Sequence, residues 1–161
     1  MKLYRLHTIQ RLPLSMDEAW AFFSSPKNLP LITPPWLDFQ MTNAVPDVMH
    51  TGAIITYTIR PMLGLKVHWT TEITHADAPG LFVDEQRFGP YRLWHHQHHF
   101  RSIDGGTEVE DLVHYALPFG PLGRLVHAVK VRKQLEAIFA FRREALAERF
   151  GVVETVADRE F

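Results

Sequence analysis

The stretch RLWHHQHHF, residues 92–100, holds four of the ten histidines of this 161-residue chain. An imidazole can bind a metal, exchange a proton near neutral pH or form hydrogen bonds. On a β-strand, alternate side chains share one face, so this stretch divides into two sets. The set with aromatic members is expected to face the core: Trp94, His96, His98 and Phe100. His95 and His99 are expected at the surface.

Carboxylates on the neighbouring strands are predicted to meet the inward histidines. If residues 103–106 form a four-residue hairpin loop, His98 lies opposite Asp111 and Trp94 lies opposite Tyr115. This register places inward residues opposite inward residues, as the two-residue period of a strand requires. Directly opposed side chains lie roughly 5 Å apart at Cβ, near enough to form hydrogen bonds.

The preceding hairpin adds a second carboxylate. If residues 89–91 form its loop, His96 lies opposite Asp84 and Trp94 lies opposite Gln86. Pairing with histidine offsets the several kcal/mol that an inward carboxylate without a partner would cost, and it should raise the histidine pKa. The predicted polar ladder is Asp84, His96, His98 and Asp111, with Gln86 and Tyr115 beside it.

Several roles are open to this ladder. It can fix the strand register, form the polar end of a ligand cavity, or use the His98–Asp111 pair for general acid–base catalysis. The His96-Gln97-His98 spacing can also chelate zinc, if Asp84 or Asp111 supplies a third ligand. Because the carboxylates compete with a metal for the same imidazoles, no metal and no cofactor is assigned.

Seven segments with strand-like alternation must position these residues. They are 3–12, 38–45, 53–60, 66–75, 81–88, 91–101 and 107–117. Between the first two, Ser15 and Glu18 form a capping box that starts a helix. The proline-rich segment 25–36 predicts a short helix and a turn.

A long final helix is predicted from about residue 121 to residue 150. Its apolar stripe has helical spacing and comprises Leu122, Leu125, Val126, Val129, Leu135, Ile138, Phe139, Leu146 and Phe150. The charged residues mostly lie off this stripe and are expected to face solvent: Lys130, Arg132, Lys133, Arg142 and Arg143. This cationic side could meet anionic lipid headgroups, so transient membrane contact is left open.

Composition excludes several classes of protein. A net charge of −1 gives no global basic field for nucleic acid. The absence of cysteine excludes thiolate metal sites, disulfides and cysteine nucleophiles. The N-terminus does not resemble a secretory signal, and no apolar run approaches the ~20 residues that cross a bilayer. We expect a cytoplasmic monomer or homodimer, with one domain over residues 1–150 and a tail over 151–161.

The order of elements predicts an α+β fold. A curved seven-stranded antiparallel sheet would wrap around the long C-terminal helix, with two short helices between strands 1 and 2. One helix is too narrow to cover such a sheet, so a gap between them is expected, where small apolar ligands can bind. The proline-stiffened loops 33–37 and 118–123 would then rim this cavity.

The chain also resembles a known superfamily. The segments FFSSPKNLPLITPPWLDF, TTEIT, FVDEQRFGPYRLWHHQHHF and GGTEVEDLVHYALPFGPLG, with the closing helix, are similar to a bacterial branch of the START / polyketide-cyclase-like superfamily. This resemblance covers residues 3–150 and implies the helix-grip fold of the birch-pollen allergen. It also implies a cavity for lipids, sterols, quinones, polyketides or plant hormones. A minority of members catalyse cyclisation or aromatisation.

We therefore expect binding or transport of a small hydrophobic ligand: a lipid, a quinone or a polyketide-like molecule. The apolar contacts would come from Tyr57, Trp69, Phe82, Trp94, Phe100 and Phe139, and the polar ones from Asp84, Gln86, His96, His98, Asp111 and Tyr115. One alternative is a polyketide cyclase, dehydratase or aromatase that uses His98 and Asp111. Another is a non-catalytic interaction or stress-related protein without a ligand.

Overall fold

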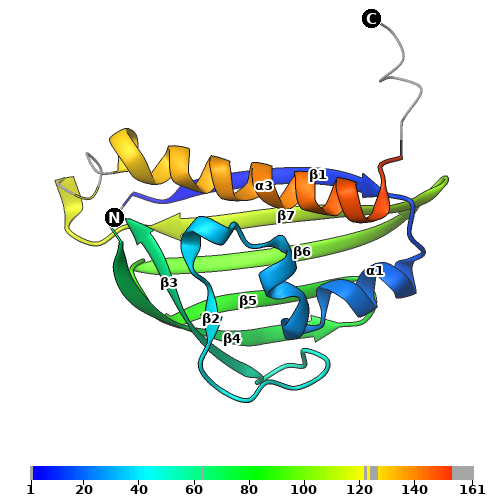
Figure 1. Cartoon of the computed structure of the whole chain (residues 1–161), viewed down its shortest axis with the longest axis horizontal. Coiled ribbons are helices and arrows are strands. Elements are labelled where there is room, and N and C mark those ends of the chain that lie inside the picture. Colours follow the sequence, from blue (N-terminus) through cyan, green and yellow to red (C-terminus); the bar gives the residue numbers. More distant parts are fainter. Residues whose placement is uncertain (1, 63, 122, 124–126, 154–161) are drawn as a thin grey trace, which may run out of the picture.

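A computed structural model describes residues 2–62, 64–121, 123 and 127–153 of the chain. Its centre is a seven-stranded antiparallel sheet with the strand order β1-β7-β6-β5-β4-β3-β2. The sheet curves around a long helix, α3 (Arg132–Phe150), as Figure 1 shows. The predicted helix-grip arrangement is thereby confirmed. The strands are β1 (Tyr4–Leu12), β2 (Gln40–Met41), β3 (Ile54–Met62), β4 (Leu65–Asp77), β5 (Leu81–Phe88), β6 (Leu93–Ile103) and β7 (Gly106–Ala116).

The segment between β1 and β2 forms three short helices, α1 (Met16–Phe23), η1 (Pro26–Ile32) and η2 (Pro35–Leu37). The predicted capping box is present at the start of α1. Ser15 Oγ accepts a hydrogen bond from the Glu18 backbone N–H at 3.3 Å, and the Glu18 carboxylate accepts one from the Ser15 N–H at 2.9 Å. Ala19 and Phe23 are buried, so α1 closes one end of the space between sheet and helix.

β2 is much shorter than the predicted 38–45 segment. Asp38 adopts a left-handed backbone conformation with φ of 46° as it ends η2. Beyond Met41, the Asn43 side chain takes the place of a backbone partner, since its amide donates to the Ile54 carbonyl and accepts from the Thr56 N–H. A side-chain amide therefore continues the hydrogen bonds where the strand would otherwise run.

The β6–β7 hairpin has the predicted register. His98 lies opposite Asp111, and Trp94 lies opposite Tyr115. Its loop is shorter than predicted, because Ile103 also pairs with Gly106 and only residues 104–105 remain unpaired. Gly105 has φ of 81°, a conformation that glycine adopts without strain.

The β5–β6 register agrees with the prediction at Asp84, which lies opposite His96. The paired region ends one residue later, so the predicted pairing of Gln86 with Trp94 is wrong. Gln86 instead binds the backbone of Tyr91: its amide donates to the carbonyl at 2.7 Å and accepts from the N–H at 3.2 Å. The loop after β5 therefore holds the Gln86 side chain through two hydrogen bonds.

β4 departs from regular pairing at several points. Its register with β5 shifts between Thr70 and Thr71 and again between Ile73 and His75, and its register with β3 shifts near Ile59. Bulges bend a strand and increase its twist. These irregularities let β3 and β4 curl away from the sheet plane and around the interior.

The final helix differs from the predicted continuous one. A wide π-helical turn, η3 (His127–Val131), precedes α3. Leu135, Phe139 and Leu146 of the predicted stripe are buried, but Val129 is 66% exposed and Val131 is buried in its place. A π turn contains an extra residue, which rotates the helix face. The predicted positions 122, 125 and 126 lie outside the described residues.

The predicted tail falls mostly outside the described residues. Within it, the Val153 N–H donates to the Arg11 carbonyl at 3.1 Å. No helix in the described part of the chain is long and apolar enough to cross a membrane.

Candidate functional site

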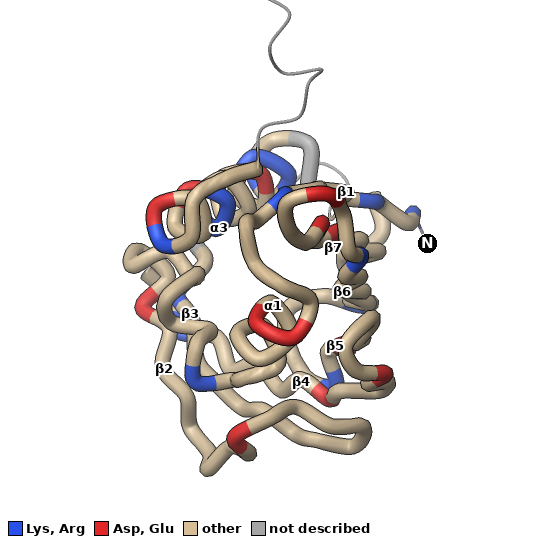
Figure 2. Tube along the Cα trace, turned by 90° about the vertical axis from the view of Figure 1, so that its right-hand side faces the viewer, with Lys and Arg blue, Asp and Glu red and all other residues tan. Residues whose placement is uncertain are grey.

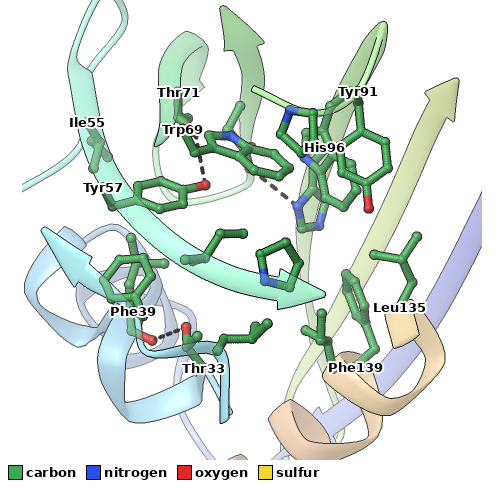
Figure 3. Close-up of a pocket in the computed structure, with 18 of the residues that line it drawn as sticks. Thr33, Phe39, Ile55, Tyr57, Trp69, Thr71, Tyr91, His96, Leu135 and Phe139 are labelled. Carbon is green, nitrogen blue, oxygen red and sulfur yellow. Dashed lines mark hydrogen bonds and ion pairs between the residues drawn. The ribbon is translucent and has the colours of Figure 1, made fainter. Parts of the chain in front are cut away.

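A cavity of about 480 Å³ lies between the sheet, α3 and the segment with η1 and η2. Its volume is within the usual range for small-molecule sites. Figure 3 shows Tyr57, Trp69 and His96 on the sheet side of this cavity, with Leu135 and Phe139 of α3 facing them. Eight of the twelve predicted ligand-binding residues line it: Tyr57, Trp69, Phe82, Asp84, Trp94, His96, His98 and Phe139.

The other four predicted residues, Gln86, Phe100, Asp111 and Tyr115, do not line the cavity. Gln86 is held by the loop after β5. The ring of Phe100 packs against Phe23 of α1, with ring centroids 5.4 Å apart. Tyr115 stacks on a tyrosine of β1, and Asp111 lies behind the two histidines. Strand parity placed all four on the inner face, but neighbouring side chains cover them.

Aromatic rings form much of the wall. Trp69 stacks on Tyr57 with ring centroids 5.9 Å apart and meets Trp94 edge-on at 5.4 Å. Phe39 packs against Tyr57 at 4.8 Å. The wall also includes Thr33 and Leu37 of the loop that was predicted to rim the cavity, but the sequence reasoning missed Leu29, Ile32 and Phe39 beside it. Their only signal was the apolar character of the proline-rich segment.

The polar ladder is present, but each histidine forms its hydrogen bond with the carboxylate that was predicted to lie opposite the other histidine. His96 Nε2 lies 2.9 Å from Asp111 Oδ1, and His98 Nε2 lies 2.8 Å from Asp84 Oδ2. Each histidine therefore binds the carboxylate diagonal to it. The directly opposed pairs are also close: His98 Nδ1 lies 2.9 Å from Asp111 Oδ1, at an angle unsuited to a hydrogen bond, and His96 Nδ1 lies 3.4 Å from Asp84 Oδ2.

Arg142 of α3 completes this cluster and was not predicted. Its Nη2 lies 3.2 Å from Asp111 Oδ1, and its side chain is 13% exposed and lines the cavity. The expectation that Arg142 faces solvent is therefore wrong. It is spaced three residues after Phe139 and four before Leu146, on the buried stripe itself. That spacing, together with the two inward carboxylates predicted on the sheet, could have indicated that Arg142 is buried.

The cluster balances its charges. Burial alone would raise the pKa of Asp111, but the Arg142 guanidinium and the histidines hold it well below its usual value. The same competition, between burial and the two histidines, leaves the pKa of Asp84 lowered. Burial lowers the pKa of His98, but the adjacent carboxylates of Asp111 and Asp84 raise it above its usual value overall. Burial and the charge of His98 together lower the pKa of His96. Two carboxylates thus face one guanidinium and two imidazoles, of which His98 holds a proton more readily than His96.

Metal binding is the other chemistry open to these groups. Asp84, His96 and His98 each offer one ligand atom, and these atoms lie within 4.8 Å of one another. A divalent cation there would compete with a proton for His98, whose pKa is raised, and would lie near the Arg142 guanidinium. Both effects weaken metal binding, so the electrostatics favour a hydrogen-bonded polar site.

Three buried nitrogens of residues in the described cavity wall have no hydrogen-bond partner: Trp69 Nε1, Arg142 Nε and His98 Nδ1, the last of which faces Asp111 at 2.9 Å. A buried donor without a partner costs roughly 1–3 kcal/mol. The N–H groups of Trp69 and Arg142 would regain this free energy if a ligand oxygen reached them.

Comparisons with known proteins identify the fold. No family model matches the sequence, and no curated protein does. Among solved structures, a protein from Rhodobacter sphaeroides matches at 22% identity and a TM-score of 0.60, over 89% of this chain and 93% of that one. A protein from Thermus thermophilus matches at 18% identity and a TM-score of 0.65, over 92% and 96%.

A plant protein is also similar. Major latex-like protein 151 from Panax ginseng matches at 12% identity and a TM-score of 0.66, over 92% of this chain and 97% of that one. The match extends over nearly the full length of both chains. At such low identity these likenesses show a shared fold, and this chain has the helix-grip fold that its sequence resemblance implies.

Proposed function

We propose that this protein binds a small, largely apolar molecule that carries a hydrogen-bond acceptor, in the cavity between the sheet and α3. The observation that carries this proposal is an aromatic-walled cavity of about 480 Å³ with two buried N–H donors that lack partners among the described residues. Apolar walls favour burial of the ligand body. The donors of Trp69 and Arg142 favour a carbonyl, hydroxyl or ether oxygen on it. Lipids, quinones and polyketide-like molecules all meet this description.

The polar cluster supports an uncharged acceptor. Its two carboxylates already pair with Arg142 and with His98, whose pKa they raise. A further negative charge on the ligand would have no counter-charge in the cluster, unless His96 also took up a proton. A neutral oxygen can accept from Arg142 Nε without that cost.

The enzyme alternative has weaker support. A general base needs a ring nitrogen within hydrogen-bond reach of the reacting proton. Both ring nitrogens of His98 face carboxylates, at 2.8 Å and 2.9 Å. The partner proposed for it, Asp111, does not line the cavity. The geometry therefore favours binding over turnover by this pair.

Extraction and native mass spectrometry of the purified protein test whether a small molecule co-purifies with it. A competition assay then measures how well a quinone, a fatty acid methyl ester and a saturated hydrocarbon displace the dye 1-anilinonaphthalene-8-sulfonate. The two oxygen-bearing probes should compete. Trp69→Phe keeps an aromatic ring in the wall but removes the indole N–H. It should weaken their binding by roughly threefold to tenfold, the value of one net hydrogen bond.

The matched control is Trp36→Phe, because Trp36 lies outside the cavity wall and packs on Phe141. It should leave the affinities unchanged. Hydrocarbon binding should be the same in all three proteins. The proposal fails if no oxygen-bearing probe competes, or if the hydrocarbon binds as tightly as the others.

A further inference from the structure

We propose that one end of this molecule docks onto the surface of an anionic lipid bilayer. This end is formed by the β3–β4 turn, the β5–β6 loop, the segment after β7 and the start of the C-terminal helix. Because the strands are antiparallel, these four connections lie at the same end of the sheet. Figure 1 shows them together at its left side.

Exposed apolar side chains concentrate here. The four most exposed large hydrophobic residues in the described part of the chain are Leu65, Phe88, Phe119 and Val129, at 65%, 74%, 79% and 66% exposure. One comes from each of the four connections, and we call them the docking residues. Phe119 has φ of 66°, an uncommon backbone conformation for a residue with a side chain. A cluster of exposed apolar residues on one surface commonly marks an interaction site.

Positive charge accompanies these residues. Lys66, Arg92, Lys130 and Lys133 are exposed at this end. Within the part of the chain that the structure describes, none of the four forms an ion pair with a carboxylate. The described residues of this end, within 60–66, 87–94 and 116–134, include no Asp or Glu, and the nearby carboxylates of Asp38 and Glu136 pair with Arg60 and Arg132.

The opposite end has a different character. Asp17 and Glu18 lie in the first turn of α1, Asp77 ends β4, and Asp104 lies in the β6–β7 loop. Figure 2 views that end and shows acidic positions on α1 and near the strand turns. Basic side chains near that end pair with carboxylates: Arg11 and Arg101 with Glu108, and Lys27 with Asp47. The unpaired cations of the docking end therefore favour its orientation toward an anionic surface.

A bilayer fits this end better than a folded protein partner would. The docking residues stand on four separate connections and do not form a groove. Isolated apolar tips surrounded by cations can insert among acyl chains while the cations meet anionic headgroups. Pro61, Pro90 and Phe119 also line the cavity, so the docking end is continuous with it. Docking itself does not depend on what the cavity binds.

The test is co-sedimentation of the full chain with vesicles of two compositions: phosphatidylcholine alone, and phosphatidylcholine with phosphatidylserine. We expect binding to the anionic vesicles at low salt, at least tenfold weaker binding to neutral ones, and loss at high salt. Replacing Lys130 and Lys133 by Gln together should weaken binding by roughly 25-fold, about fivefold per charge. Phe88→Ser combined with Phe119→Ser should also weaken it.

Matched controls come from elsewhere on the surface. Val48→Ser combined with Val152→Ser removes two exposed apolar side chains away from the docking end, and Arg143→Gln removes an exposed charge further along α3. These should bind as the native chain does. All substitutions are at exposed positions, and an unchanged thermal midpoint verifies that each variant is folded.

Equal binding to both kinds of vesicle, or no binding to either, would overturn the proposal. So would variants of the docking end that bind as tightly as the controls.

Discussion

Removal of the Arg142 side-chain charge should strongly destabilise the protein. In Arg142→Met the long apolar stem is kept, but the guanidinium 3.2 Å from Asp111 is lost. Asp111 is buried, and its remaining partners are the two histidines. The carboxylate then stays in the interior with less positive charge around it.

The magnitude follows from burial. Removing one partner of a buried ion pair typically costs about 3–5 kcal/mol. Because Asp111 keeps its contacts with His96 and protonated His98, the lower end of that range, about 3 kcal/mol, applies here. In a chain of this size, that loss corresponds to a fall of roughly 6–12 °C in Tm.

The loss should also depend on pH. The pKa of Asp111 is depressed in the folded protein, so its charge stabilises the fold above its unfolded pKa of about 3.8, and this contribution disappears as pH falls through the folded pKa. Arg142 is a main cause of that depression. The difference between Arg142→Met and the native chain should therefore be largest above pH ~4 and shrink in acid.

Thermal and urea unfolding of four proteins provide the assay: the native chain, Arg142→Met, Asp111→Asn and the double variant. Arg143→Met is the control, since Arg143 is the next residue and its side chain is exposed. It should shift Tm by little. The double variant should lose less than the sum of the two single variants, because removing both charges leaves neither one unpaired. Equal Tm values for Arg142→Met and Arg143→Met, or strictly additive losses, would refute the reasoning.

Other perturbations test single features of the site and fold. His98 should titrate above its usual pKa of 6.5 and His96 below it in NMR; a common midpoint would contradict the charge balance inferred for the cluster. Protonated His98 stabilises the fold below pH ~6.5, and that contribution is lost as pH rises through its raised pKa, so His98→Gln should remove this part of the pH dependence of urea unfolding. Ser15→Ala should lower the free energy of unfolding by about 0.5–2 kcal/mol through loss of the Glu18 capping box; an unchanged urea midpoint would argue against the cap. Leu146→Ala should lower it by about 2–5 kcal/mol.

The inner face of the sheet was predictable because strand parity is a local rule. The alternation around His96 and His98 decided which rings point inward, and two hairpin loops then placed Asp84 and Asp111 opposite them. Strand parity could not predict which imidazole nitrogen forms a hydrogen bond with which carboxylate oxygen. The exchanged hydrogen bonds arise from the orientation of the two imidazoles, which lie 3.7 Å apart between ring centroids and are tilted by 36° to each other.

What the sequence reasoning missed came from a loop contact, a contact between helix and sheet, and an irregular helical turn. Gln86 has inward parity, but the loop that follows its strand captures its amide. Arg142 was assigned to the solvent face because charged residues usually lie there, yet its position on the helix is that of a core residue. The orientation of the first helical turn was also not predicted. The π turn rotates Val129 outward, and the apolar pattern of the sequence does not indicate it.

The polar cluster divides into parts with different roles. Asp111 lies outside the cavity wall and connects β7 to α3 through Arg142, so its role is to hold the helix against the sheet. Asp84, His96 and His98 line the cavity. Buried ion pairs give little net stability compared with well-packed apolar side chains, so packing alone does not require charges there. A ligand that needs oriented donors gives the cavity-facing part a reason to be polar. Under the proposed function, the histidine strand is a structural pairing whose inner surface also orients the bound molecule.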